Sequence, residues 1–427
     1  MISCIDTEQR ACVYSLNREK TKEEPEKPPA LKGDHMTTFL LVLIYIAFIS
    51  LGLPDAILGS AWPVLHGELG VSVSWAGILT MIVSGGTILS SFFSAKVISR
   101  FGTGKVTAVS VAMTAAGLLG YCFSPDFFWL CLFAVPLGLG AGAVDSSLNN
   151  FVALHYKATH MNWLHCFWGI GATAGPFLMS FFLLRENGWR AGYGTIGVLQ
   201  CVLVVCLIAS LPVWKKFEDG KAGETEEASG TDTGLWKLVK MPGAKPALLS
   251  FFCYCAVESS TGLWSSTFLV QERGLSPEAA ARWVSLFYMG ITAGRALAGF
   301  LAMKFNNKQM IRIGESVCIL GCIFAALPGW NGFAFLGLIF IGLGCAPVYP
   351  AMLHDTPNRF GKEMSQGIMG IQMATAYVGA TFMPPVLGVL GKALGFSVHP
   401  FFLLALAVLM LLTSERVNGI MNGKKAV

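Results

Sequence analysis

Twelve stretches of mostly apolar residues follow one another along this chain of 427 residues. They cover residues 38–62, 74–98, 105–124, 127–153, 163–184, 192–213, 246–270, 279–303, 309–327, 331–353, 364–390 and 396–414. Each has the length of about twenty residues that an α-helix needs to cross the hydrocarbon of a bilayer. Only 13% of the residues are charged and 54% are hydrophobic, whereas soluble domains carry about 25% charged residues. We therefore predict an all-α integral membrane protein with twelve transmembrane helices.

The basic residues are distributed unevenly around these stretches. If both ends of the chain lie on one side, that side collects 24 of the 30 Lys and Arg residues. The opposite side holds five, which are Arg185, Arg190, Arg273, Arg282 and Lys392. Because cytoplasmic loops carry the excess of Lys and Arg, we expect both termini in the cytoplasm of a multi-pass protein of the cell membrane.

Polar segments divide the chain into parts. We expect residues 1–36 to be a disordered or non-native tail, since they are polar and lack the apolar core of a signal peptide. Residues 37–213 form a first six-helix bundle, 214–245 a cytoplasmic linker and 246–415 a second six-helix bundle. Residues 416–427 are expected to be a cytoplasmic tail.

The two bundles are related by an internal repeat. Residues 95–105 align with 299–309, and residues 138–145 align with 342–349, both at an offset of 204. In the first helix of each half, Asp55 and Gly59 align with Glu258 and Gly262 at an offset of 203. Parallel repeats place the substrate site at the midplane between the halves. The duplication thus predicts that Asp55 and Glu258 face one cavity from opposite sides.

Three acids lie at membrane depth, namely Asp55, Asp145 and Glu258. A carboxylate there costs roughly 2.5–3.5 kcal/mol on insertion scales, so it marks a functional site by default. Pro54 disrupts the helical hydrogen bonds and frees a carbonyl about one turn earlier, as in broken helices that line cavities. Without a basic neighbour, a carboxyl in this position is able to bind and release a proton. The pattern indicates a transporter in which these acids bind substrate and couple protons.

Further polar groups are candidates for contact with the solute. Asn149 lies one turn after Asp145, and a carboxylate and an amide can bind adjacent sugar hydroxyls; an interhelical hydrogen bond is the alternative. His165 and Trp168 share a helix face, where the imidazole could contact a sugar, relay a proton or bond a carbonyl. Trp264 is expected to stack on a sugar ring or to belong to an interfacial belt.

In the second half, the repeat places Tyr349 and Gln372 opposite the first-half candidates, with ordinary helix-packing polarity as the alternative. Arg295 is the basic residue inside a predicted span. We expect it to be structural or gating, either reaching towards the cytoplasmic end of its helix or pairing with an acid such as Glu315.

Other chemistry has no support in the sequence. The twelve cysteines form no CxxC pair or His-spaced set that is typical of a metal site. No GxxxxGK[ST] loop for phosphates and no catalytic triad are present. We therefore expect no metal, no cofactor and no enzymatic activity.

The loop after the second span retains Arg100, Gly102 and Lys105 of the signature G-x-L-A-D-R-x-G-R-R, and resembles the major facilitator superfamily. Ser99 replaces its Asp, so the loop departs from the usual charge relay; Arg100 and Gly102 keep an expected gating role. The segments LPDAILGSAWP, VDSSLNNF, NWLHCFWGIGATAGP and GLGCAPVYPAM resemble the fucose–proton symporter branch of bacterial sugar permeases across residues 38–414. The resemblance implies sugar uptake driven by protons. It implies that Asp55 and Asp145 bind substrate and couple protons, and that Asn149 and His165 contact the substrate.

We therefore expect a secondary transporter that carries a monosaccharide, a hexose or deoxyhexose, with protons by alternating access. The expected partners are this small molecule, protons and the lipid bilayer; no nucleic acid is expected, and the chain is expected to be a monomer. A proton-coupled exporter of drugs or metabolites is the main alternative, and would have a greasier cavity. A non-transporting membrane sensor is a further alternative, and would need a folded signalling domain.

Overall fold

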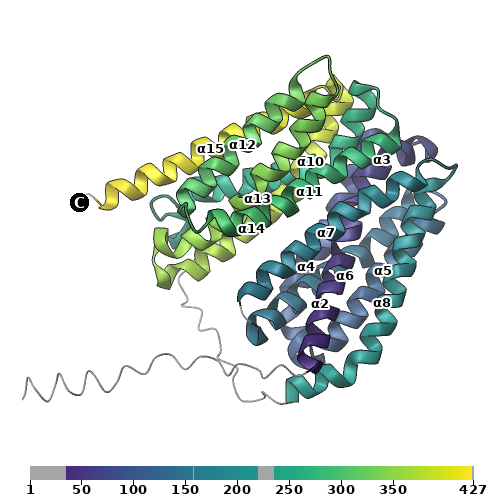
Figure 1. The fold of residues 1–427 in the computed structure, drawn as a ribbon, viewed down its shortest axis with the longest axis horizontal. Helices are drawn as coiled ribbons and strands as arrows, with labels where there is room; N and C mark the ends of the chain where they lie inside the picture. The colour runs from purple at the N-terminus through teal and green to yellow at the C-terminus, as the bar shows by residue number, and fades with distance from the viewer. Residues whose placement is uncertain (1–34, 157, 220–234, 426–427) are drawn as a thin grey trace, which may run out of the picture. The chain divides into compact units, whose positions relative to one another are not determined.

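The computed structural model describes residues 35–156, 158–219 and 235–425, and in these residues it contains helices and no strand. The first half holds α2 (His35–Asp55), α3 (Ile57–Glu68), the 3-10 helix η1 (Val73–Trp75), α4 (Ala76–Phe101), α5 (Thr103–Phe123), α6 (Phe127–His155), α7 (Ala158–Phe182) and α8 (Gly188–Asp219). The second half holds α9 (Leu235–Val239), α10 (Ala244–Arg273), α11 (Pro277–Leu301), α12 (Asn307–Ala326), α13 (Gly332–Phe360), α14 (Lys362–Leu394) and α15 (Val398–Lys425). Figure 1 shows the longer of these helices, such as α5, α6 and α8, running along one another. The predicted all-α class is confirmed.

Each predicted span coincides with one long helix or, for the first, with the pair α2 and α3. Within the described residues, ten spans are long and apolar enough to cross a membrane, whereas α7 and α10 are long but are not among the ten. In α10, the run from Glu258 to Thr267 is rich in Ser and Thr, which lowers its hydropathy. The prediction of twelve transmembrane helices is therefore only partly confirmed.

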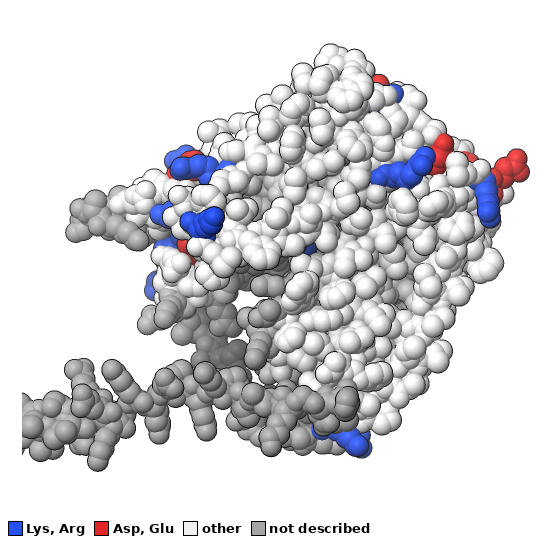
Figure 2. All heavy atoms as spheres, viewed as in Figure 1, with Lys and Arg blue, Asp and Glu red and all other residues white. Residues whose placement is uncertain are grey.

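Figure 2 shows a face on which charged side chains lie near the margins and a broad area between them is uncharged.

The helix ends refine the predicted parts of the chain. Contacts divide the chain into the units Met1–Val42, which holds the start of α2, and Leu43–Val427. The helix α8 continues to Asp219 and α9 lies within the predicted linker, while residues 220–234 lie outside the described residues. The last helix continues to Lys425, beyond the predicted end of the second bundle. Of the predicted tail at residues 1–36, residues 1–34 lie outside the described residues, and the last two begin α2.

The first span is interrupted next to Asp55, as Pro54 predicts. The helix α2 ends at Asp55, Ala56 is a turn residue, and α3 begins at Ile57. Pro54 has no N–H to offer the carbonyl of Ser50 one turn earlier. The Gln200 side chain of α8 instead donates its Nε2–H to that carbonyl at 2.9 Å, and Gln200 accepts from the Thr114 hydroxyl of α5 at 2.6 Å. The broken helix is thus held by two neighbouring helices, which is how such breaks are tolerated at membrane depth.

Small residues bring α6 close to α4. A Cβ added at Gly138 would lie 2.2 Å from the Val83 carbonyl oxygen, and one at Gly142 would lie 2.4 Å from the Thr87 carbonyl oxygen. The Thr87 hydroxyl donates to the Gly138 carbonyl at 3.2 Å. Close approach through small residues and hydroxyl bonds across helices are typical of transmembrane helix packing.

In the described part of the second half, two ion pairs lie in different surroundings. Arg359 donates to Asp355 across 2.5 Å, and both side chains are almost fully buried, at 7% and 8% exposed. Arg312 donates to Glu415 across 2.6 Å, with side chains that are 60% and 37% exposed. The first pair is shielded from water, and Arg359 also donates to the Asn418 side chain at 3.4 Å, whereas water compensates much of the second pair.

We predict that Asp355→Asn destabilises the protein far more than Glu415→Gln. Removing Asp355 leaves the Arg359 guanidinium buried and uncompensated, which costs about 3–5 kcal/mol. Loss of the exposed pair costs about 1 kcal/mol or less. Thermal unfolding of the purified protein in detergent, followed for both variants in parallel, measures the difference. Equal shifts in the melting temperature would contradict the assignment.

Candidate functional site

A cavity of about 300 Å³ lies between helices of both halves. Asp55 and Glu258 both line it, as the internal repeat predicts. Hydroxyl groups make up most of the remaining polar lining: Thr80, Ser84 and Thr87 of α4, Tyr121 of α5, Tyr193 of α8, Ser259 of α10, Tyr288 of α11 and Tyr377 of α14. The volume is at the lower end of the range for small-molecule sites. The lining contains two carboxyls and several hydroxyls but no Lys or Arg side chain.

Asp55 is presented to the cavity by the break in the first span. Its side chain is exposed there, and its Oδ2 accepts the indole N–H of Trp168 at 2.9 Å. Trp168 lies on α7 and lines the same cavity. The indole thus orients one carboxylate oxygen and leaves the other available to a solute or a proton.

Arg295 lies on the other side of Trp168. Its guanidinium carbon is 5.2 Å from the centre of the Trp168 ring, within the range of a cation–π interaction. Among the described residues it forms no ion pair, so of the two alternatives considered for Arg295, pairing with Glu315 is wrong. Glu315 is fully buried on α12, where it accepts a hydrogen bond from Ser414 of α15. Trp168 therefore connects Asp55 at its N–H with Arg295 at its ring face.

The residue pairs that the repeat aligns meet in space. A Cβ added at Gly59 would lie 2.3 Å from the Gly262 carbonyl oxygen, so α3 and α10 cross in direct backbone contact. A Cβ at Gly262 would lie 2.2 Å from the Tyr288 hydroxyl oxygen. Glu258 is one turn before Gly262 and half-buried. The crossing therefore brings Glu258 to the same cavity as Asp55.

Asp145 and Asn149 form a pair within α6 outside the lining. The Asn149 amide donates to the Asp145 carboxylate at 2.9 Å, so the bond is within one helix and not the interhelical bond considered above. Both side chains are half-buried, and the Asn149 carbonyl oxygen has no partner among the described residues. Asp145 is close enough to Asp55 for the two charges to interact. It belongs to the electrostatic surroundings of the cavity but is not part of its wall.

Three further candidates have partners outside the cavity lining. His165 is half-buried, with its ring edge-on to Phe48 at 6.1 Å. The Tyr349 hydroxyl donates to the Met373 sulfur at 3.2 Å. The buried Gln372 accepts from the Thr356 hydroxyl at 3.0 Å. These contacts are those of helix-packing polarity, the alternative considered for Tyr349 and Gln372.

Trp264 is placed in the core, away from both positions expected for it. Its side chain is fully buried, and its Nε1–H donates to the Pro384 carbonyl at 2.7 Å. The ring packs on Phe396 with centroids 5.1 Å apart. The indole satisfies a backbone carbonyl of a proline-containing helix, which is a structural role.

The predicted loop residues lie between α4 and α5. Arg100 is exposed and lies over Phe101, with 5.6 Å between the guanidinium carbon and the ring centre. Gly102 has φ of +82°, a backbone conformation that favours glycine, and it separates the two helices. Their gating role stays a prediction.

The sequence reasoning missed most of the hydroxyls in the wall. Thr80, Ser84 and Thr87 are spaced four and three residues apart, so they share a face of α4, and this polar stripe could have been found. Tyr121 and Tyr193 carry a weaker signal, because each shares its helix face with a polar residue only two turns away, Thr114 in α5 and Gln200 in α8. The structure describes no group of three or more His, Cys, Asp or Glu side chains that could hold a metal ion.

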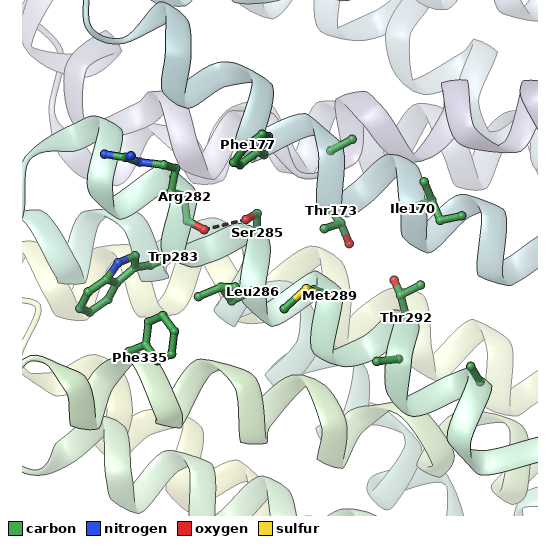
Figure 3. Close-up of a pocket in the computed structure, with 13 residues that line it drawn as sticks. Ile170, Thr173, Phe177, Arg282, Trp283, Ser285, Leu286, Met289, Thr292 and Phe335 are labelled. Carbon is green, nitrogen blue, oxygen red and sulfur yellow. Dashed lines mark hydrogen bonds between the residues drawn. The ribbon is translucent and has the colours of Figure 1, made fainter. Parts of the chain in front are cut away.

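A larger hollow of about 740 Å³ lies between α7 and α11 and contains none of the acids. Figure 3 shows Ile170, Thr173 and Phe177 facing Leu286, Met289 and Thr292 across it. Ile170, Phe177 and Met289 are each about half exposed, at 46%, 48% and 45%. An apolar groove of this kind at membrane depth suits acyl chains better than a polar solute. We assign the site to the smaller cavity for that reason.

We predict that two matched Trp→Phe substitutions act differently. Trp264→Phe leaves the buried Pro384 carbonyl without its donor and should lower the free energy of unfolding by about 1–3 kcal/mol. Trp168→Phe releases Asp55 at an open cavity and should leave the melting temperature nearly unchanged while weakening solute binding. Thermal unfolding and a binding titration on both variants measure this. A large loss of stability in Trp168→Phe alone would contradict the placement.

Comparisons with known proteins agree with this architecture. The family profile of the Major Facilitator Superfamily matches residues 44–367 and 247–418. The glucose/mannose transporter GlcP of Bacillus subtilis is 21% identical over 316 residues, which are 72% of this chain and 77% of that protein. The cis,cis-muconate transport protein of Acinetobacter baylyi is 22% identical over 369 residues, 81% of this chain and 88% of its own length.

Among solved structures, a D-xylose-proton symporter superposes with a TM-score of 0.67 at 14% identity, over 88% of this chain and 97% of its own. At that identity the likeness concerns the fold. The family profile covers most of the chain, and it agrees with the helical halves and the cavity between them. The chain belongs to the Major Facilitator Superfamily of membrane transporters, which are not enzymes.

Proposed function

We propose that this transporter carries a neutral monosaccharide, a hexose or deoxyhexose, together with protons. The observation that carries the proposal is the composition of the 300 Å³ cavity, whose polar lining consists of two carboxyls, an indole and hydroxyls, without a Lys or Arg side chain. Sugar hydroxyls both donate and accept hydrogen bonds, and this lining offers both functions. An anionic solute such as a dicarboxylate would find no cation in this wall.

The aromatic lining supports a sugar in the same way. Trp168 offers one ring face and Tyr288 and Tyr377 add further rings, and a few convergent polar groups on an aromatic wall are typical of small-molecule sites. The glucose/mannose transporter and the D-xylose-proton symporter are relatives whose names state sugars. The cis,cis-muconate relative carries an organic acid by its name. The cation-free wall is what favours the sugar.

Proton coupling is proposed for Asp55, Asp145 and Glu258. Neither Asp55 nor Glu258 forms an ion pair in the part of the chain that the structure describes. A carboxyl without a cation can exchange its charge for a proton with little rearrangement. When Asp55 is ionised, the Trp168 N–H stabilises it; when it is protonated, the loaded cavity is neutral enough to reorient across the membrane.

Alternating access is supported by the contacts between the halves. Gly59 lies against Gly262, and a Cβ added at Gly77 would lie 2.8 Å from the Cα atom of Pro385. The Ser266 hydroxyl donates to the Ser60 carbonyl at 3.5 Å. These contacts lie towards the helix ends that adjoin the 69–72, 274–276 and 395–397 connections. Rocking of the halves about such a crossing would open that side and close the other.

We further propose that both termini are cytoplasmic, that the chain resides in the cell membrane and that it works as a monomer. The distribution of Lys and Arg supports this orientation. The contacts described above then lie on the outer side, and the cavity is closed towards the outside.

The proposal predicts sugar-dependent proton entry that depends on Asp55. The purified protein is reconstituted in liposomes that contain a pH-sensitive dye, and a panel of hexoses, deoxyhexoses and polyols is offered outside. A transported sugar should acidify the lumen, and lowering the external pH should speed its uptake because protons enter with it. Asp55→Asn, which is permanently neutral, should abolish proton entry and accumulation but retain exchange of sugar between the two sides.

A matched control is Glu272→Gln on the same helix as Glu258, since Glu272 is exposed near the end of α10. It should leave proton entry unchanged, whereas Glu258→Gln should reduce it. Sugar movement without protons would exclude symport and assign the acids to binding. No response to any sugar would overturn the proposal and favour an exporter, which is then tested with preloaded liposomes and organic cations.

A further inference from the structure

One buried acid of the second half has no part in the transport cavity. Glu315 of α12 is fully buried and does not line that cavity. It lies eight residues after Asn307, where α12 begins, which is about 12 Å along the helix. In the orientation proposed above, this is the cytoplasmic side of the protein. The mechanism proposed for transport makes no use of this carboxyl.

Two serines connect Glu315 to neighbouring helices. The Ser414 hydroxyl of α15 is in hydrogen-bond contact with Glu315 Oε1, and it lies 2.8 Å from the Ser250 hydroxyl of α10. The Ser250 hydroxyl in turn lies 3.3 Å from the Met410 carbonyl oxygen. Both serines are only 2% exposed. The three contacts form a buried chain that joins α12, α15 and α10.

The number of hydrogen bonds in this chain depends on the charge of Glu315. Each serine hydroxyl has one proton to donate and a backbone carbonyl has none, so the two serines can supply donors for only two of the three contacts. If Glu315 is ionised, it accepts from Ser414, which accepts from Ser250, and no proton is left for the Met410 carbonyl. If Glu315 is neutral, it donates to Ser414, and Ser414 donates to Ser250. Ser250 is then free to donate to Met410. The neutral form therefore makes one more hydrogen bond than the ionised form.

The second carboxyl oxygen of Glu315 also favours the neutral form. Among the described residues, Oε2 has no hydrogen-bond partner and Glu315 forms no ion pair. An ionised carboxyl places half of its charge on each oxygen. A buried charge without donors is far more costly than a buried neutral carbonyl oxygen, so the group is expected to take up a proton.

The charged groups around Glu315 balance one another without it. The titratable groups close enough to interact with it come from its own helix and from α10, α13 and α15, and they are Arg312, Cys318, Cys253, Arg359 and Glu415. Arg312 is paired with Glu415. Arg359 is paired with Asp355. Each of the two cations thus has its own carboxylate, and an ionised Glu315 would add a negative charge without a partner.

We propose that Glu315 is a proton-binding site separate from the transport cavity, and that it joins α10, α12 and α15 only while it holds its proton. Release of the proton removes one hydrogen bond from the chain and leaves a negative charge in a buried place, so water must enter between these helices. Ser250 lies about two turns before Glu258 on α10. An alkaline cytoplasm would therefore loosen the helix that carries a cavity acid. Glu315 would bind its proton whichever solute is carried.

The test compares the unfolding of the protein and of Glu315→Gln over a range of pH. Glutamine has the size of a neutral glutamic acid and no charge, so the difference between the two proteins isolates the proton on Glu315. In the unfolded chain a glutamate releases its proton near pH 4.3. The native protein then binds one proton more than the unfolded chain, so its stability falls as the pH rises. From about pH 5 to 8, the unfolding equilibrium constant should rise relative to that of Glu315→Gln by up to tenfold per pH unit.

Glu415→Gln is the matched control. Glu415 follows Ser414 on α15, but its side chain is 37% exposed and paired with Arg312. It is ionised in the native and the unfolded protein over this range of pH, so its substitution should not produce the trend. A flat difference between the protein and Glu315→Gln, or one that favours the unsubstituted protein at high pH, would show that Glu315 is ionised in the fold.

Infrared spectroscopy gives a second readout that needs no unfolding. A neutral carboxyl has a carbonyl stretching band that a carboxylate lacks. At neutral pH one such band should disappear in Glu315→Gln and remain in Glu415→Gln. Ser414→Ala removes the hydroxyl that accepts from Glu315 and should shift the same band, which identifies it even if Glu315→Gln does not fold.

The outcomes separate this site from the transport mechanism. If no carboxyl band depends on Glu315 or Ser414, Glu315 is ionised and the proton-binding site is wrong. If Glu315→Gln lowers the number of protons that enter with each sugar, Glu315 belongs to the transport path and is not a separate site. If no sugar is transported, the proposed function falls, while the unfolding and infrared results for Glu315 keep their meaning.

Discussion

The hydrogen bond from Gln200 to the carbonyl of Ser50 is the interaction on which the site depends. Pro54 cannot donate to that carbonyl, and a backbone acceptor without a partner is costly at membrane depth. By supplying the donor from α8, with Thr114 of α5 behind it, the first bundle makes a break in its own first helix tolerable. The break turns the chain at Ala56 and leaves Asp55 exposed to the cavity instead of sealed in a helix face. The hydrogen bond that replaces the missing N–H of Pro54 thus also determines where the Asp55 side chain lies.

The relation between the halves follows from glycines at equivalent positions. Gly59 and Gly262 are aligned by the internal repeat and touch each other in the fold, so the two first helices of the halves cross at the level where their acids lie. A side chain at Gly59 would push the crossing apart, because its Cβ would lie 2.3 Å from the Gly262 carbonyl oxygen. This close approach brings Asp55 and Glu258 to one small cavity and, with Gly77 against Pro385, joins the halves on one side of it.

Trp168 and Trp264 show how the same residue type serves two purposes in this fold. Trp264 donates its N–H to the carbonyl of Pro384 and is fully buried, so it stabilises α14. Trp168 donates its N–H to Asp55, and its ring face lies against the Arg295 guanidinium. It therefore connects the proposed proton site with a fixed charge. Sequence spacing cannot separate the two, because both lie in apolar helices one or two turns from polar neighbours. The neighbours in space decide which tryptophan can respond to protonation.

The sequence by itself determined the membrane class, the duplicated halves, the break at Pro54 and the meeting of Asp55 with Glu258. These follow from hydropathy, from a constant offset and from the chemistry of proline, all of which are local or repeated signals. Only the tertiary structure decided which other groups reach the cavity. It placed Asp145 and Asn149 in a bond within one helix, placed Trp264 in the core, and brought Tyr121 and Tyr193 into the wall. The physical reason is that a single polar side chain on an apolar helix does not show which side faces the cavity, because it can equally bond within its helix, as Asn149 does, or bond a neighbouring helix, as Gln200 does. The rotation of each helix about its axis depends on close packing with neighbouring helices, and the sequence of one helix alone does not specify that packing.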